Sequence, residues 1–315
     1  MSGLAAVFWK EIAEYFSSRR FLILLALIYL SGGWAIYNAA NFIRSEVSAS
    51  SSVFLLLFTA SGPQGVPPSF VFFLALFVPI IGIAFGFDAI NSERASGTLS
   101  RVLSQPIYRD SVVNGKFLAG LFTIATLLAS ILLLVSGVGL RMIGVAPELE
   151  EIARLATFFL VTVLYAGFWL ALAILLSLLF SRPATSALAA IAIWLFFTFF
   201  IGMIAQAVAG VLVPVDQFST EAEQMQYVDT AQFITRFSPA TLFSEAMAGL
   251  LTPSLRALGM GTLLSQPPAG MLPNPLIFSQ SFLLVWPQIL SILVLTIICF
   301  ALAYIKFMRE EIRAT

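Results

Sequence analysis

Residues 155–181 read LATFFLVTVLYAGFWLALAILLSLLFS, a run of 27 residues without a charged side chain. At a rise of about 1.5 Å per residue, an α-helix needs about 20 apolar residues to cross the hydrocarbon core of a bilayer. Arg154 precedes the run and Arg182 follows it. We therefore interpret residues 155–181 as a transmembrane helix bounded by charge at both ends.

Five further uncharged stretches are long enough to cross a bilayer, namely residues 21–43, 69–87, 117–140, 183–215 and 281–305. The last uncharged run begins at Ala257, but prolines interrupt its early part, so we place the helix after them. The sequence predicts an all-α integral membrane protein with six transmembrane helices. An even number of spans puts both termini on one side of the membrane.

The composition excludes several classes of function. The chain is 60% hydrophobic and only 10% charged, with a mean hydropathy of +0.99, so lipid must solvate much of its surface. The 16 basic and 16 acidic residues balance, which leaves no basic field to hold nucleic acid. With no histidine and a single cysteine, Cys299, a Ser-His triad, a histidine-ligated metal and an intrachain disulfide are excluded. We expect no catalytic residue and no metal site.

The distribution of Lys and Arg predicts the orientation. Loops on the cytoplasmic side of a membrane carry an excess of these residues. One side of the predicted topology holds 11 of the 16: Lys10, Arg19, Arg20, Arg94, Arg101, Arg109, Lys116, Arg182, Lys306, Arg309 and Arg313. We therefore expect a multi-pass protein of the inner, cytoplasmic membrane with both termini in the cytoplasm.

Residues 1–20 show the pattern of an amphipathic helix. Apolar side chains recur at intervals of three and four residues from Leu4 to Phe16, while Lys10, Glu11 and Glu14 fall largely on the other side. This pattern predicts a helix lying flat on the cytoplasmic leaflet, before the transmembrane domain of residues 21–315. Membrane anchoring alone would account for it.

The most distinctive loop, residues 88–116, connects the second and third spans. Asn91 or Ser92 is suited to cap a short helix there, and Leu99 and Leu103 would line one face before Pro106 ends it. Such a helix, held just outside the bilayer, suits docking into a groove on a soluble partner. A solvated loop that merely follows the positive-inside rule is the alternative reading.

The loop of residues 216–280 holds most of the extramembrane mass on the other side. It is too long for a simple turn, and its apolar residues predict short extracytoplasmic helices broken at Pro239 and Pro253. Glycines in the spans carry a separate prediction. Gly32 and Gly33 in the first span, with Gly82 and Gly86 in the second, should allow close approach of another helix.

The string FDAINSERASGTLSRVLSQPIYRDSVVNGKFLAG, residues 87–120, resembles the signature loop of ABC-2-type transporter permeases. The matching features are Asp88, the pair Glu93 and Arg94, the Gly97–Leu99 triplet, Ser104 with Pro106, and Gly115 with Lys116. The NosY-like branch, which contains the permease of nitrous-oxide-reductase maturation, is most similar. The order of six spans, a leading amphipathic helix and a long outer loop extends the resemblance over the chain.

The resemblance implies an exporter half, in which two permease copies form the pathway and two cytoplasmic ABC ATPase subunits drive it. A homodimer is therefore expected, together with membrane lipid as surroundings. In this family the 88–116 loop carries the coupling helix. The implied ATPase-docking residues are Glu93, Arg94, Gly97, Thr98, Leu99 and Leu103, with Lys10, Glu11 and Glu14 as a second contact.

The chain itself lacks a P-loop, so it is not expected to be an enzyme or to bind a cofactor. Its only Gly-Lys pair, Gly115 and Lys116, is preceded by Asp110 where the P-loop pattern needs glycine and followed by Phe117 rather than Ser or Thr. ATP and magnesium are accordingly expected on the partner subunit.

Four residues are candidates for a pathway or outer gate. Asn38 lies about 25 Å and Gln206 about 35 Å along their predicted helices, in the outer half of the membrane, where a lipid-facing amide would be costly. Since the first and fifth spans approach the two-fold axis in ABC-2-type transporters, we expect both amides, with Tyr37 and Thr198, to face that axis. Interhelical hydrogen bonds without a role in transport are the alternative.

Two other functions stay open. A non-transporting scaffold for an extracytoplasmic enzyme would share this topology. A stand-alone secondary transporter would need ionisable residues inside its spans, and none of the six runs contains Asp, Glu, Lys or Arg. The sequence does not indicate the cargo.

Overall fold

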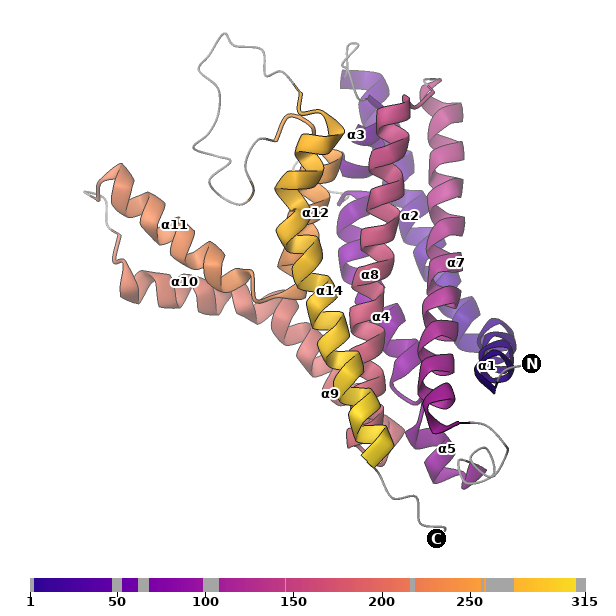
Figure 1. Ribbon diagram of the computed structural model, residues 1–315. Helices are drawn as coiled ribbons and strands as arrows, with labels where there is room; N and C mark the ends of the chain where they lie inside the picture. The colour runs from indigo at the N-terminus through magenta and orange to yellow at the C-terminus, as the bar shows by residue number, and fades with distance from the viewer. Residues whose placement is uncertain are drawn as a thin grey trace.

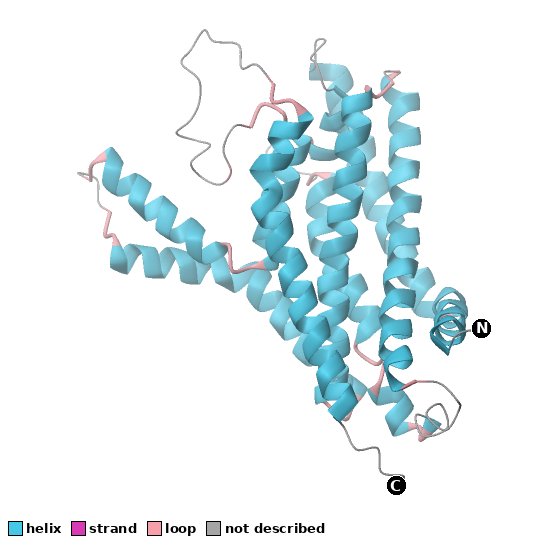
Figure 2. Ribbon diagram, viewed as in Figure 1, coloured by secondary structure: helices cyan, strands magenta, loops and turns pink. Residues whose placement is uncertain are grey.

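The computed structural model describes residues 3–46, 53–61, 68–98, 108–144, 146–215, 219–255, 258 and 275–309. These residues are almost entirely helical, and none of them forms a β-strand (Figure 2). Within the described ranges, six helical segments are long and apolar enough to cross a membrane. The predicted fold class, an all-α membrane protein with six spans, is therefore confirmed.

The spans occur in the predicted order (Figure 1). They are α2 (Arg19–Glu46), α4 (Phe70–Gly86), α7 (Arg109–Ile143), α8 (Leu149–Leu179), the segment α9 (Pro183–Leu195), η2 (Phe196–Phe200) and α10 (Ile201–Leu212), and α14 (Phe278–Arg309). The shorter helices are α1 (Gly3–Ser17), α3 (Val53–Thr59), α5 (Asn91–Ala95), α11 (Glu221–Thr235) and α12 (Pro239–Leu251).

The bundle has two ends that differ in chemistry. Helix α1, helix α5 and the last turn of α14 lie together at one end, which we call the termini end (Figure 1). Helix α3 and the turn between α7 and α8 lie at the opposite end, which we call the distal end. Helix α1 is seen nearly end-on in this view, so it runs across the bundle axis, as expected of an interfacial helix.

Helix α8, formed by the apolar run of residues 155–181, is the most buried of the spans and lies at the centre of the bundle. Trp169, Tyr165 and Ala166 are fully buried in it. Helices α4 and α14 pack along it. A helix that is apolar on every face is suited to this position, because it can be covered on all sides by other helices.

The close approach predicted at the span glycines is confirmed at Gly82 and Gly86, and at Gly32, where a Cβ atom would lie 3.0 Å from Phe70 Cε2. It is wrong at Gly33, where a Cβ atom would meet nothing within 4 Å. A Cβ atom on Gly82 would lie 2.8 Å from the Cβ of Trp169 and 2.9 Å from the carbonyl oxygen of Ala166. A Cβ atom on Gly86 would lie 2.6 Å from the Cβ of Ala173. The two glycines therefore let α4 lie directly against the backbone of α8.

Arg154 holds the distal end together. Its side chain is almost fully buried at the start of α8. One Nη atom donates to the carbonyl of Leu250 at 2.8 Å and to Ser281 Oγ at 3.0 Å, and the other donates to the carbonyl of Leu276 and pairs with Glu150 at 2.8 Å. A single guanidinium thus joins the end of α12 and the start of α14 to α8.

The fifth span departs from the straight helix expected over residues 183–215. A π-helical turn, η2, interrupts it, and beyond that turn α10 runs away from the bundle, with α11 returning alongside it (Figure 1). A π-helical turn disturbs the regular backbone ladder. At this turn the hydroxyl of Ser238, at the start of α12, donates to the carbonyl of Phe197 at 2.8 Å.

The packing of α4 on α8 makes a testable prediction. Gly86→Ala should lower the free energy of unfolding by about 1–3 kcal/mol, because the added methyl group meets backbone that cannot move aside. Gly137→Ala is the matched control, since a Cβ atom there meets nothing within 4 Å and alanine favours the helix. Thermal unfolding in detergent should show a lower midpoint for Gly86→Ala alone. Equal midpoints for the two variants would contradict this account.

Candidate functional site

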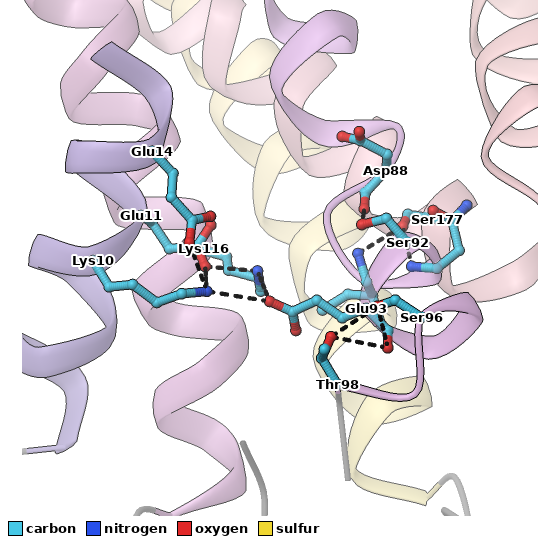
Figure 3. Close-up of polar contacts among 12 residues, drawn as sticks. Lys10, Glu11, Glu14, Asp88, Ser92, Glu93, Ser96, Thr98, Lys116 and Ser177 are labelled. Atoms are coloured by element: carbon cyan, nitrogen blue, oxygen red, sulfur yellow. Dashed lines mark hydrogen bonds and ion pairs between the residues drawn. The ribbon is translucent and has the colours of Figure 1, made fainter. Parts of the chain in front are cut away.

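Five charged residues from three helices meet at the termini end, and we call them the charged junction. They are Lys10, Glu11 and Glu14 of α1, Glu93 of α5 and Lys116 of α7 (Figure 3). All but Lys116 were among the residues implied to dock the ATPase. The structure therefore brings the two implied contact regions, α1 and the 88–116 loop, into direct contact.

Lys116 is the centre of the charged junction. Its side chain is only 4% exposed, and its Nζ lies 2.8 Å from Glu11 Oε1 and 2.9 Å from Glu93 Oε1. A buried ammonium ion is costly unless opposite charges and hydrogen bonds compensate it. Two carboxylates provide that compensation here, so the position of Lys116 fixes α1 and α5 relative to α7.

Lys10 joins the same carboxylates from the solvent side. Its Nζ lies 3.2 Å from both Glu11 Oε1 and Glu14 Oε1 and 3.5 Å from Glu93 Oε1, and its side chain is 48% exposed. Partial burial lowers the pKa of Lys10, but the nearby charges of Glu11, Glu93 and Glu14 outweigh this and raise it above its usual value. Lys10 therefore stays charged at physiological pH.

Glycine at position 115 explains how α1 reaches Lys116. A Cβ atom on Gly115 would lie 2.7 Å from Val7 Cγ1, so only glycine allows α1 to lie this close to α7. The adjacent Lys116 then faces α1 at hydrogen-bonding distance. The Gly-Lys pair thus lies inside α7, at the contact between α7 and α1, and is not a phosphate-binding loop.

The start of α5 is held by α8. The backbone N–H groups of Ile90 and Asn91 donate to Ser177 Oγ at 2.9 and 3.1 Å. The expected capping by Asn91 or Ser92 is wrong, because Ile90 occupies the N-cap position and makes no side-chain cap. Asn91 is instead fully buried and its amide donates to the carbonyl of Phe87. The Ser177 hydroxyl, far away in sequence, therefore accepts the backbone N–H groups that a local cap would otherwise bind.

A cavity of about 360 Å³ adjoins the charged junction between α1, α4 and α5. Arg20 and Asp88 form an ion pair on its wall, and the Arg20 guanidinium lies 5.0 Å from the centre of the Phe87 ring. Tyr15, also on the wall, donates to the carbonyl of Phe85 at 3.3 Å. Burial, followed by the charges of Glu11 and Asp88, raises the pKa of the Tyr15 hydroxyl, so it remains a neutral donor.

Three other residues implied to dock the ATPase, Arg94, Gly97 and Thr98, are described by the structure and are not part of the charged junction. Gly97 and Thr98 are exposed, and a Cβ atom on Gly97 would meet nothing within 4 Å. Gly97 has a φ of 68°, a conformation that favours glycine. Arg94 is half-buried at the end of α5. Leu99 and Leu103 lie outside the described residues, so the structure gives no position for them.

The four candidate pathway residues are not brought together within one chain. Tyr37 and Asn38 lie on α2, whereas Thr198 and Gln206 lie on η2 and α10, on a different side of the bundle (Figure 1). The Asn38 amide donates to the carbonyl of Trp34 one turn earlier, so a local bond satisfies it. Tyr37 and Gln206 are exposed, and the Thr198 hydroxyl is buried without a hydrogen-bond partner.

Lys116 is the central residue that the sequence analysis did not place in the site. The sequence analysis counted it among the basic residues of the positive-inside pattern and in a Gly-Lys pair that does not match the P-loop pattern. A signal was nevertheless present, because Lys116 falls at helical spacing with Val112, Ala119 and Thr123, all of them buried. A charged residue on the buried face of a helix needs a partner.

Among the described residues no group of His, Cys, Asp and Glu is arranged to hold a metal ion.

Two lysines that contact the same carboxylates give a matched test of the charged junction. Lys116→Met should lower the free energy of unfolding by about 3 kcal/mol, because it leaves Glu11 and Glu93 buried beside one weaker partner. Lys10→Met should cost less than about 1 kcal/mol, since half of that side chain is in water. Chemical unfolding of the purified protein measures both. Similar losses for the two variants would show that burial of Lys116 is unimportant.

Comparison with known proteins agrees with this geometry. The relative described as "Probable ABC transporter permease protein NosY", from Pseudomonas aeruginosa strain PAO1, is 33% identical over 130 residues. That alignment covers 39% of this chain and 46% of the relative, which is less than half of either. Residues 5–312 match the family described as ABC-2 family transporter protein, nearly the whole length of the chain. The chain therefore belongs to the ABC-2 family of transporter proteins.

Proposed function

We propose that this chain is the transmembrane permease subunit of an ATP-driven exporter, which works as a dimer coupled to separate cytoplasmic ABC ATPase subunits. Family membership supports the permease assignment. The similar P. aeruginosa protein is described as a probable ABC transporter permease, which supports a partner that hydrolyses ATP. The excess of Lys and Arg around the termini end supports its placement in the cytoplasm.

The observation that carries the proposal is how α5 is attached to the transmembrane helices. On its inner side α5 is bound twice, through Ser177 of α8 and through the ion pair of Glu93 with Lys116. Beyond α5, Gly97 and Thr98 are exposed. A short segment fastened to the spans on one side and open on the other is suited to pass a displacement from a docked partner to the spans.

This attachment of α5 divides the implied docking residues into two groups. Glu11 and Glu93 are largely buried and bound to Lys116, so we assign them to transmission inside the subunit. Gly97 and Thr98, with Lys10 and Glu14 at the edge of α1, remain candidates for the surface that touches the ATPase. Arg94 lies between the two groups.

ATP and magnesium would then bind to the partner. The sequence around Gly115 and Lys116 lacks the P-loop pattern, and the Lys116 amine is already bound to Glu11 and Glu93. The two carboxylates bound to this amine would repel a phosphate group, which makes Lys116 a poor phosphate ligand.

The translocation pathway belongs to the same proposal. Several large apolar side chains of α2 are exposed in the single chain, among them Trp34 and Tyr37. A second copy of the chain would cover such a face and bring Tyr37 and Asn38 near the dimer axis, with Thr198 of the fifth span as a further candidate.

Thr98→Trp tests the proposed docking surface. The larger side chain should block contact with the ATPase subunit and abolish ATPase stimulation, while the unfolding temperature of the isolated permease stays unchanged, because Thr98 is exposed. The control is Gln226→Trp on α11, which is also exposed but lies away from the termini end. Co-purification and phosphate release by the complex are the measurements.

Three results would contradict the proposal. The first is phosphate release by the permease alone after stringent purification. The second is unchanged assembly and turnover with Thr98→Trp, which would favour a solvated loop. The third is failure of any ATPase subunit to co-purify, which would favour the scaffold alternative. Glu93→Lys is a poorer probe of docking, because it would also break the contact with Lys116.

A further inference from the structure

We propose that the cavity between α1, α4 and α5 binds the headgroup of a phospholipid that carries a primary amine. The ammonium group of this lipid would lie inside the cavity, which has a volume of about 360 Å³, and its phosphate would bind Arg19 at the mouth. The lipid would come from the leaflet at the termini end. The proposal concerns a lipid site on the chain itself and does not depend on coupling to an ATPase.

The cavity opens at the boundary between the interfacial helix and the first span. Its wall includes Glu14 near the end of α1 and Arg19 and Arg20 at the start of α2, and all three are exposed. Leu22 and Ile23, within one turn of these arginines, are 60% and 65% exposed. Apolar side chains at the start of a span are suited to acyl chains, and arginines beside them to the level of the headgroups. A lipid whose chains lie against Leu22 and Ile23 therefore has its headgroup at the mouth of the cavity.

The interior of the cavity has spare hydrogen-bond acceptors. Glu11 lines it and is only 4% exposed, and Lys116 and Lys10 both bind the Oε1 atom of its carboxylate. Asp88 lies across from α1, just after α4, and pairs with Arg20 through Oδ2 (Figure 3). Among the described residues no hydrogen bond reaches Glu11 Oε2 or Asp88 Oδ1. Buried carboxylate oxygens need donors, so a ligand with several N–H groups would stabilise this cavity.

The hydroxyl groups on the wall cannot supply these donors, because they are already used. The Tyr15 hydroxyl donates to the carbonyl of Phe85, and the Ser92 hydroxyl donates to the backbone carbonyl of Asp88. Arg19 makes no hydrogen bond or ion pair within the described part of the chain. Its guanidinium is well suited to bind a phosphate group. The site thus offers acceptors inside the cavity and a guanidinium at its mouth.

A headgroup with a primary amine matches this order of charges. Its ammonium group carries three N–H donors, as that of lysine does, and a short linker joins it to the phosphate. A choline headgroup has the same charge but no N–H donor. An anionic headgroup without an amine would leave the oxygens of Glu11 and Asp88 unbound and would be repelled by them. A metal ion is not favoured, because no His, Cys, Asp and Glu group in the described ranges is arranged to hold one.

Native mass spectrometry of the delipidated full chain in detergent tests the proposal. Phosphatidylethanolamine and phosphatidylcholine with identical acyl chains are titrated separately, and the lipid-bound fraction is measured. The unmodified chain should bind phosphatidylethanolamine about tenfold more tightly, because only that lipid donates hydrogen bonds to the buried carboxylates. This comparison needs no variant, so it does not depend on how a substitution affects folding.

Two variants test the two ends of the site. Arg19→Ala should weaken the binding of phosphatidylethanolamine about tenfold, because it removes a charge-assisted bond to the phosphate. Arg182→Ala is the matched control, since Arg182 is also an exposed arginine of the termini end but is not on the wall of the cavity. Asp88→Asn, which keeps the shape of the side chain, should reduce the preference for phosphatidylethanolamine over phosphatidylcholine.

Four results would overturn the proposal. Equal binding of the two lipids by the unmodified chain would favour contacts with acyl chains alone. Equal losses with Arg19→Ala and Arg182→Ala would favour a general attraction to basic surface. Water-soluble glycerophosphoethanolamine that binds as tightly as the lipid would favour a soluble amine as the ligand. Absence of any bound phosphatidylethanolamine would favour a basic side chain of a partner protein.

Discussion

A lysine side chain withdrawn from water at the end of a membrane bundle must have its charge balanced on the spot, and Lys116 meets this constraint with Glu11 and Glu93. Its two partners come from the amphipathic helix α1 and from α5, neither of which has a core of its own. Gly115 lets α1 come close enough, and Ser177 of α8 holds the start of α5. The surface proposed to receive the ATPase thus depends on one buried ammonium ion.

The distal end also depends on a buried cation whose hydrogen-bonding groups are satisfied, in this case an arginine. Arg154 is buried at the start of α8 and binds the carbonyl of Leu250 near the end of α12 and that of Leu276 just before α14. Glu245 of α12 binds Gln232, Arg236 and Gln288. Between these contacts and the charged junction the packing of α4 on α8 is apolar and tight, as the contact of Gly86 with Ala173 shows. Motion of one end relative to the other therefore has to pass through rigid helices.

The fifth span is the exception to this regular packing. Its π-helical turn lies where the Ser238 hydroxyl binds the Phe197 carbonyl, and the chain beyond it leaves the bundle. Turns of this type are frequent at functional sites in helices.

Local patterns in the sequence were enough to predict the six spans and the close contacts of Gly82 and Gly86, because length, hydropathy and side-chain size along one helix decide them. The charged junction was predicted only in part: Lys10, Glu11, Glu14 and Glu93 were chosen, but as a docking surface, and Lys116 was not. Only the tertiary structure decided that Lys116 meets Glu11, 105 residues away, and that Ser177 replaces a local cap on α5. It also decided where the fifth span leaves the bundle. Each of these depends on a partner distant in sequence, and hydropathy records how much of a helix avoids water without recording which neighbour it meets.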